Sequence, residues 1–139
     1  MRVFQRTVEI GTRGRGLYDV TRKVGDIVAA SGVTTGLATV FVQHTSASLV
    51  IQENADPAVQ RDMERWLGAL APEDARAYEH ADEGPDDMPA HLRAVVTRTN
   101  ESIPVGDGRL ALGTWQALYL WEHRTAAHRR RLVVHVHGV

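Results

Sequence analysis

Apolar residues recur along this chain at two spacings, one typical of strands and one typical of helices. The segments whose composition predicts strands are residues 2–10, 37–43, 50–51, 102–105, 110–121 and 131–137. The segments with helical spacing lie between them, mostly in the middle of the chain. Helices in the middle and strands at both ends indicate an α+β fold with a mostly antiparallel sheet.

Three helices are predicted from their start signals and apolar faces. The first begins at Asp19, which would cap it, and ends at Gly32; its apolar residues are Val20, Val24, Ile27 and Val28. The second begins at Asp56-Pro57, with the carboxylate as cap and proline in the first turn; its apolar residues are Val59, Met63, Trp66, Leu67 and Leu70. The third begins at Asp87-Met88-Pro89; its inward residues are Met88, Leu92, Val95 and Val96.

The length and composition fit one globular domain spanning residues 1–139. Apolar residues make up 43% of the chain and charged residues 24%, which excludes global disorder. Cysteine is absent, which excludes disulfides, thiolate nucleophiles and cysteine-based zinc sites. Sixteen basic and seventeen acidic residues give a net charge of −1, so we expect neither nucleic acid nor a membrane to be held by bulk charge. With no long apolar run and no apolar signal core in residues 1–6, a cytoplasmic protein is expected.

The most informative bias in the composition is the number of histidines, seven in 139 residues. Histidine is the commonest metal ligand and titrates near neutral pH. His44 opens the polar stretch 44–48 directly after a buried strand, a position that more often faces a pocket or an interface than a core. Taken alone, His44 is better explained as a structural histidine. Asp87 and His91 are four residues apart, so one helical face would present both. Asp87 then either caps the helix or pairs with the imidazole as a metal-orienting or acid–base pair. With His80 on a polar loop, three imidazoles become available for a metal site.

Three weaker candidates remain. Asn54 has no evident role as a helix cap, and the helix N-terminus that follows it would favour an anionic ligand at this position. Glu122 and Arg124 fit a cross-strand pair. The basic residues 129–131, together with Arg124, fit a solvated turn, a phosphate clamp or a pairing with the acidic 73–87 loop of a neighbouring subunit. Nucleic-acid binding by these arginines is not expected, because the aromatic residues lie in apolar runs.

These segments together resemble the YjbQ family, also described as secondary thiamine-phosphate synthases. The residues that carry the resemblance are His44-Thr-Ser-Ala-Ser48, Glu53-Asn-Ala-Asp-Pro57, Tyr78-x-His80, Gly84-x-Asp-Asp-Met-Pro-Ala-His91, Ile103-Pro-Val105, Gly108-Arg-Leu-Ala-Leu-Gly-Thr-Trp-Gln116 and Glu122-His-Arg124. Their order and spacing match over essentially the whole chain. The resemblance implies a compact domain with β-sandwich-like sheets that assembles as a homotrimer.

The resemblance also implies a polar site that holds a divalent metal such as Zn²⁺. The implied activity is a weak thiamine-phosphate synthase reaction, which joins a pyrimidine pyrophosphate to a thiazole phosphate and releases pyrophosphate. It implies that Asp87 and His91 carry the function and that His44 and His80 are site histidines. The resulting hypothesis is an enzyme in which His44, His80 and His91 hold the metal. Ser46, Asn54 and Arg124 would bind the phosphate-bearing substrate.

One departure from the family pattern affects this hypothesis. Where family members have a Gly-Ser-Ser-like segment before Ile-Pro-Val, this chain has Thr99-Asn100-Glu101-Ser102. If that loop binds phosphate, Glu101 would repel it, so the synthase activity is in question. The alternative is a non-catalytic homotrimeric protein that binds a metal or a ligand.

Overall fold

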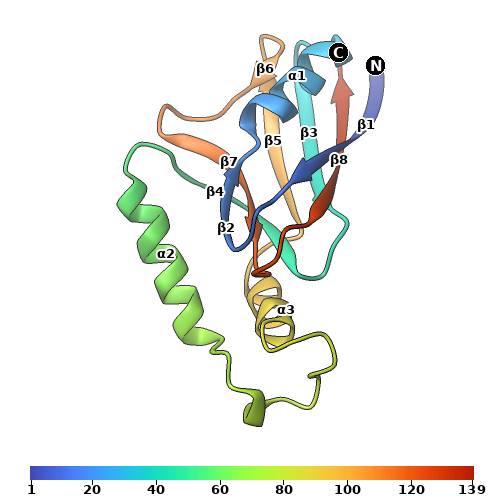
Figure 1. Cartoon of the computed structure of the whole chain (residues 1–139). Coiled ribbons are helices and arrows are strands. Elements are labelled where there is room, and N and C mark those ends of the chain that lie inside the picture. Colours follow the sequence, from blue (N-terminus) through green and yellow to red (C-terminus); the bar gives the residue numbers. More distant parts are fainter.

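A computed structural model describes residues 1–139, and its strands form two antiparallel sheets (Figure 1). The larger sheet has the order β1-β8-β3-β5-β6, with β1 Arg2–Gly11, β8 Arg129–Gly138, β3 Gly36–Val42, β5 Asn100–Gly106 and β6 Arg109–Leu110. The smaller sheet has the order β2-β7-β4, with β2 Gly16–Asp19, β7 Gln116–Glu122 and β4 Ala47–Glu53. The predicted α+β class with antiparallel sheets is confirmed.

The hydrophobic core is a cluster of 18 buried residues drawn from both sheets and from helix α1, Thr21–Ser31. Along β8, Leu132, Val134 and Val136 are buried at alternate positions, as expected for a strand with one face on the core. The residues that α1 itself buries in the core are Val24, Ile27 and Val28. The helix ends at Gly32, whose φ of 73° suits glycine, so the predicted end is confirmed.

The start of this helix differs from the prediction by one position. Asp19 is the last residue of β2, and its Oδ1 accepts a hydrogen bond from the Thr21 backbone N–H at 2.9 Å. Val20 occupies the N-cap position and makes no side-chain capping bond. The sequence missed β2 because its residues follow a glycine-rich turn and form only a four-residue strand.

The predicted strand at residues 110–121 is interrupted. β6 ends at Leu110 and β7 begins at Gln116. The Gln116 Oε1 accepts a hydrogen bond from the Gly113 backbone N–H at 2.8 Å, which closes a turn between the two strands. Trp115 lies in this turn and is 64% exposed, so it is not a core residue in this chain.

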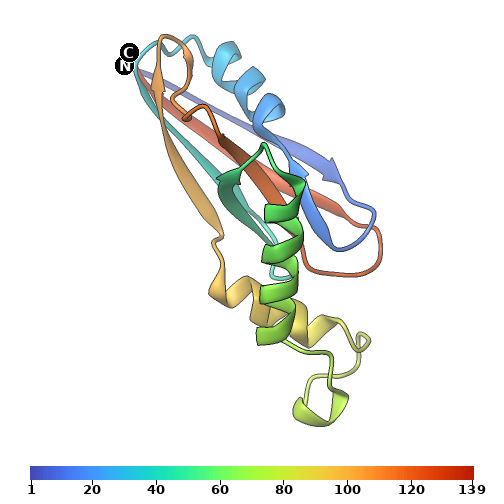
Figure 2. The same cartoon turned by 90° about the vertical axis from the view of Figure 1, so that its left-hand side faces the viewer.

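Helix α2, Pro57–Leu70, begins as predicted: the Asp56 side chain accepts from the Ala58 backbone N–H at 2.9 Å, with proline in the first turn. Its predicted apolar residues are only partly covered, since Leu67 is buried, Val59 and Met63 are half-buried, and Trp66 and Leu70 are exposed. Figures 1 and 2 give the reason, because α2 runs beside the sandwich and past its end rather than lying flat on a sheet.

Helix α3, Asp87–Val96, lies beyond one end of the sandwich, opposite the two chain termini (Figures 1 and 2). Its buried residues are Asp87, Pro89, Ala90 and Arg93. Of the four residues predicted to point inward, Met88 and Leu92 are half-buried, whereas the prediction is wrong for Val95 and Val96, which are 77% and 59% exposed. The buried face of α3 is partly polar because it packs against polar groups. For example, the Arg93 guanidinium donates a hydrogen bond to Glu64 of α2 at 3.0 Å. None of the helices has the length and apolar character needed to cross a membrane.

Candidate metal centre

Two histidines and one aspartate meet at α3. His80, Asp87 and His91 each offer one ligand atom, and these atoms all lie within 4.8 Å of one another. Asp87 Oδ2 is 2.6 Å from His80 Nε2 and 3.1 Å from His91 Nε2. The Asp87 side chain is 3% exposed, whereas the two rings are 43% and 31% exposed. The cluster therefore has a buried carboxylate and opens to solvent on its histidine side.

The helix and the loop before it bring these residues together. Asp87 and His91 are in register because residues four apart share one face of α3, as the sequence predicted. His80 follows the short 3₁₀ helix Ala75–Ala77 and reaches the cluster through a turn. That turn includes Gly84, whose φ of 99° is in the left-handed region that glycine adopts without strain.

The hydrogen bonds of His91 decide which ring nitrogen can bind a ligand. Its Nδ1 lies 3.0 Å from the carbonyl oxygen of Thr45 and must carry the proton, because a carbonyl oxygen only accepts. In the neutral ring, Nε2 then has a lone pair that faces Asp87 Oδ2, which is also an acceptor. Two acceptors 3.1 Å apart require either a second proton on the ring or a cation between them.

The donor set fits a divalent metal ion. Two imidazole nitrogens and one carboxylate oxygen are ligands that Zn²⁺ takes in catalytic sites, where a fourth position stays open. The backbone bond to Nδ1 is the outer contact that orients a ligating histidine. The exposed side of the rings of His80 and His91 leaves room for that fourth position.

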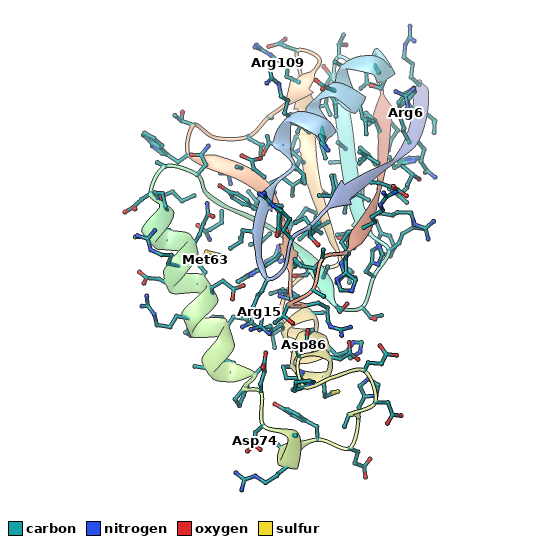
Figure 3. All side chains as sticks on the ribbon, in the orientation of Figure 1. Arg6, Arg15, Met63, Asp74, Asp86 and Arg109 are labelled. Atoms are coloured by element: carbon teal, nitrogen blue, oxygen red, sulfur yellow. The ribbon has the colours of Figure 1, made fainter.

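Arg124 fixes the buried carboxylate. Its Nη1 donates to Asp87 Oδ1 at 2.8 Å, its Nε donates to Asp86 Oδ2 at 2.9 Å, and its Nη2 donates to the carbonyl oxygen of Glu83 at 2.9 Å. Figure 3 places Asp86 at the junction between α3 and the sheets. Because Arg124 holds Oδ1, the other carboxylate oxygen of Asp87 is the one turned toward the histidines.

Both aspartates are ionised in this setting. Burial alone would raise the pKa of Asp86, but hydrogen bonds from Arg124 and from the Thr125 backbone lower it to about 2. Burial would likewise raise the pKa of Asp87, but the hydrogen bond from His80 and the charges of His91 and Arg124 bring it below its usual value. The cluster therefore presents a negative charge to an incoming cation.

A second buried ion pair lies beside this cluster. Glu122 is fully buried and Arg130 is 4% exposed, and the Arg130 Nε donates to Glu122 Oε1 at 2.8 Å while its Nη2 donates to Oε2. Thr12 Oγ1 donates to the same carboxylate at 2.7 Å. The expected pairing of Glu122 with the Arg124 side chain is wrong, because that guanidinium bonds the two aspartates and only the Arg124 backbone N–H reaches Glu122.

The structure does not bring His44 into the three-residue cluster. Its Nε2 accepts a hydrogen bond from the Arg131 backbone N–H at 2.8 Å, and its Nδ1 lies 3.4 Å from the Arg130 guanidinium. Burial, followed by the positive charges of both arginines, lowers the pKa of His44. Its ring lines a hollow of about 470 Å³ with His91, whose other lining residues are Thr45, Ala94, Val95, Thr97 and Thr99.

The three predicted substrate-binding residues occupy different places. Ser46 is buried and its Oγ accepts from Arg130 at 3.0 Å, so it faces the ion pair. Asn54 is exposed just beyond the opposite end of β4, which at about 3.3 Å per residue puts it on the order of 25 Å from Ser46. Arg124 lies at the cluster, but each of its three nitrogens has a partner in the chain.

The role of Arg130 was missed in the sequence, where it was assigned to a basic cluster. The signal that could have found it is the period of two along the last strand. Counting back from the buried Leu132 places Arg130 on the inward face, and Arg129 and Arg131 on the outward face. A buried arginine needs a buried carboxylate, and Glu122 ends the apolar run of β7.

His123 is a further buried titratable group on the sandwich side of the cluster. It is fully buried, and its Nε2 is 2.8 Å from Ser48 Oγ. Burial, with the charges of Arg93, Arg15 and Arg130, lowers the pKa of His123 to about 3. The ring is therefore neutral in the folded protein throughout the neutral range.

This neutral histidine predicts an acid-sensitive fold. Between pH 6.5 and about 3 the unfolded chain binds a proton at His123 that the folded chain does not. The stability from this residue is thus present above pH 6.5 and is lost as the pH falls. Urea unfolding with a chelator at pH 7, 6 and 5 should show a slope in the wild type that His123→Gln reduces by up to about 1.4 kcal/mol per pH unit. Equal slopes in the two proteins would contradict this.

The fold and the cluster define a class of small α+β proteins with a histidine–aspartate group at one end of a two-sheet sandwich. A family model described as UPF0047 protein YjbQ-like matches residues 6–139, and the chain belongs to this family. It is 53% identical to a UPF0047 protein of Synechocystis over 99% of this chain and 93% of that protein. It is 41% identical to the UPF0047 protein YjbQ of Salmonella typhimurium, covering 97% and 98% of the two chains.

Solved structures have the same fold. A YbjQ-like protein from Sulfolobus solfataricus aligns with a TM-score of 0.89 at 27% identity, covering 99% of both chains. A conserved hypothetical protein from Thermus thermophilus aligns with a TM-score of 0.81 at 36% identity, covering 93% of this chain and 97% of that one. The resemblance drawn from the sequence motifs is therefore confirmed at the level of the family.

Proposed function

We propose that this protein is a metal-dependent enzyme acting on a phosphate-bearing small molecule, with Zn²⁺ held by His80, Asp87 and His91. The observation that carries the proposal is the pair of facing acceptors at the cluster. His91 Nε2 and Asp87 Oδ2 lie 3.1 Å apart while the other ring nitrogen is fixed by the Thr45 carbonyl. Either a proton on His91 Nε2 or a cation completes a site arranged this way, and the proposal is that a metal cation does so, because His80 offers a third ligand atom within 4.8 Å of the other two. Asp87 replaces His44 in the ligand set that the sequence predicted.

The chain's own groups would position the substrate around this site. When bound, a divalent metal neutralises the developing charge on phosphate oxygens. The hollow beside His91 has Thr97 and Thr99 on its wall. The Thr97 hydroxyl already donates to the Arg93 carbonyl oxygen at 2.8 Å, so the Thr99 hydroxyl is the one that can donate a hydrogen bond to a phosphate. Arg124 keeps Asp87 ionised and oriented, so its part is that of a positioning residue. Ser46 and Asn54 stay predictions as substrate contacts.

The specific reaction we propose is the one the family resemblance implies. The thiazole nitrogen forms a bond to the methylene carbon of the pyrimidine pyrophosphate, and the bond from that carbon to the pyrophosphate oxygen breaks. The electron pair leaves with pyrophosphate, so neither oxidant nor reductant is needed. Stabilising that leaving anion is the task for which a cation beside a hydroxyl donor such as that of Thr99 would be suited.

The alternative is a non-catalytic homotrimeric protein that binds a metal or a ligand. One observation favours assembly: large apolar side chains on α2 and α3 have no cover in a single chain. They are Trp66, Leu70, Val95 and Val96, with exposures between 57% and 77%. Exposed apolar patches mark interaction sites in soluble proteins, and these side chains are the ones that assembly would bury. Assembly as a homotrimer is compatible with both functions, so turnover is what separates them.

The test is product formation by the zinc-loaded protein. Incubated with the pyrimidine pyrophosphate and the thiazole phosphate, it should release pyrophosphate and thiamine phosphate in equal amounts, measured by chromatography. Asp87→Asn should reduce the rate by about 100-fold or more, because it removes the charge that holds both the histidines and the metal. Asp26→Asn, an exposed position on α1, is the matched control and should not change the rate. A zinc-loaded protein without turnover would favour the binding protein.

A further inference from the structure

Glu101 occupies a position where an apolar residue is expected. Along β5, residues alternate between exposed and buried, and Glu101 shares the buried face with the core residues Ile103 and Val105. Its register partner on β3 is Val40, which is fully buried. Glu101 is only 8% exposed. A carboxylate therefore extends the core face of the strand, directly at the end of the sheet.

This carboxylate has no hydrogen-bond donor within the chain. The nearest cation is Arg98, whose Nη1 is 3.6 Å away, beyond hydrogen-bonding distance, and whose side chain is 73% exposed. The other buried carboxylates are treated differently, since Asp86, Asp87 and Glu122 each accept several hydrogen bonds. Burial raises the pKa of Glu101, and the charge of Arg98 only partly opposes this. Its only partner in the chain is thus one long ion pair to an exposed arginine, and its oxygens are not among the fully buried unpartnered atoms, so the carboxylate is open to a hydrogen-bond donor from outside the chain.

The surroundings of Glu101 are open to a ligand. It lines a polar hollow of about 480 Å³ whose wall is formed by Thr97, Arg98, Thr99, Asn100, Glu101 and Ser102. This hollow adjoins the one beside His91, because Thr97 and Thr99 line both. One molecule lying across these two threonines would meet His91 at one end and Glu101 at the other.

We propose that Glu101 is a specificity residue that binds an amidine-like nitrogen group, cationic or with paired N–H donors, at the end of the substrate away from its phosphate. This rests on the proposed function for the phosphate end. An amidinium, or an aminated heterocycle that is protonated at the adjacent ring nitrogen, presents two N–H groups side by side, which a carboxylate accepts in a bidentate pair. The same negative charge turns a phosphate away, so Glu101 also sets the direction of binding.

The test uses benzamidinium, which carries the nitrogen group and no phosphate. It should bind the wild-type protein in calorimetry and shift the carboxyl ¹³C signal of Glu101. Uncharged benzamide should bind at least about 10-fold more weakly. Glu101→Gln should weaken benzamidinium binding by about 10-fold or more. Glu9→Gln, on exposed β1, is the matched control and should bind like the wild type.

The outcomes separate this inference from the proposed function. Equal benzamidinium binding by wild type and Glu101→Gln, or no binding by the wild type, overturns it; the second result is expected if a neighbouring copy of the chain fills the hollow. Glu101→Gln removes a buried charge and should unfold no earlier than the wild type, so misfolding does not confuse the result. Zinc content and pyrophosphate release test the phosphate end independently, and benzamidinium binding should persist after chelation.

Discussion

His91→Ala is expected to lower the affinity for Zn²⁺ by more than about 100-fold. Loss of an outer contact to a metal ligand costs 10- to 100-fold, and loss of a ligand should cost more. The substitution removes one of three donors, and His80 and Asp87 alone cannot complete a site. The His91 side chain is 31% exposed, so the fold should persist. Metal content by mass spectrometry and competition titration, on protein never exposed to a metal-affinity resin, is the measurement.

His44→Ala is the matched control for this experiment. The His44 Nε2 accepts from a backbone N–H and its Nδ1 faces a guanidinium, so neither nitrogen is free to bind a metal. This variant should keep its zinc. If His44→Ala lost zinc as completely as His91→Ala, the three-histidine set predicted from the sequence would be correct. Full zinc content in His91→Ala would refute both ligand sets.

Local rules explain why part of this site could be predicted. The four-residue spacing of Asp87 and His91 fixes their common helical face, and the structure places them in contact. The structural role of His44 depends instead on a hydrogen bond from a backbone N–H that lies 87 residues further along the chain. Spacing contains no information about such a contact. Ring orientation, and with it the choice between ligand and structural histidine, is decided by the tertiary fold.

The apolar faces show a similar limit. The pattern on α1 was interpreted correctly because that helix lies on the sheets, and Val24 and Val28 are fully buried. The same kind of pattern on α3 predicted burial for Val95 and Val96, which are exposed. Periodicity shows that one face of a helix is apolar, but it does not show whether that face packs against the chain's own core or against another molecule.

Arg130→Met is expected to lower the free energy of unfolding by about 3–5 kcal/mol. Removing one partner of a buried ion pair leaves the other charge uncompensated, and Glu122 is fully buried. Thr12 and the Arg124 backbone N–H still donate to the carboxylate, but neither carries a compensating side-chain charge against it. Urea denaturation at neutral pH measures the loss. Arg129→Met, whose side chain is 85% exposed, should change stability by no more than about 0.5 kcal/mol.

The pH dependence of the unfolding free energy provides a second, independent test of the ion pair. In the wild type, burial would raise the pKa of Glu122, but the hydrogen bonds from Arg130 and Thr12 bring it below its usual value. Its stabilisation is therefore present above the unfolded pKa and is lost as the pH falls below it. Without Arg130, burial raises the pKa of Glu122 instead, and the contribution of this residue should be lost as the pH rises. If Arg130→Met cost no more than Arg129→Met and kept the wild-type slope, the pair would not hold this end of the sandwich together.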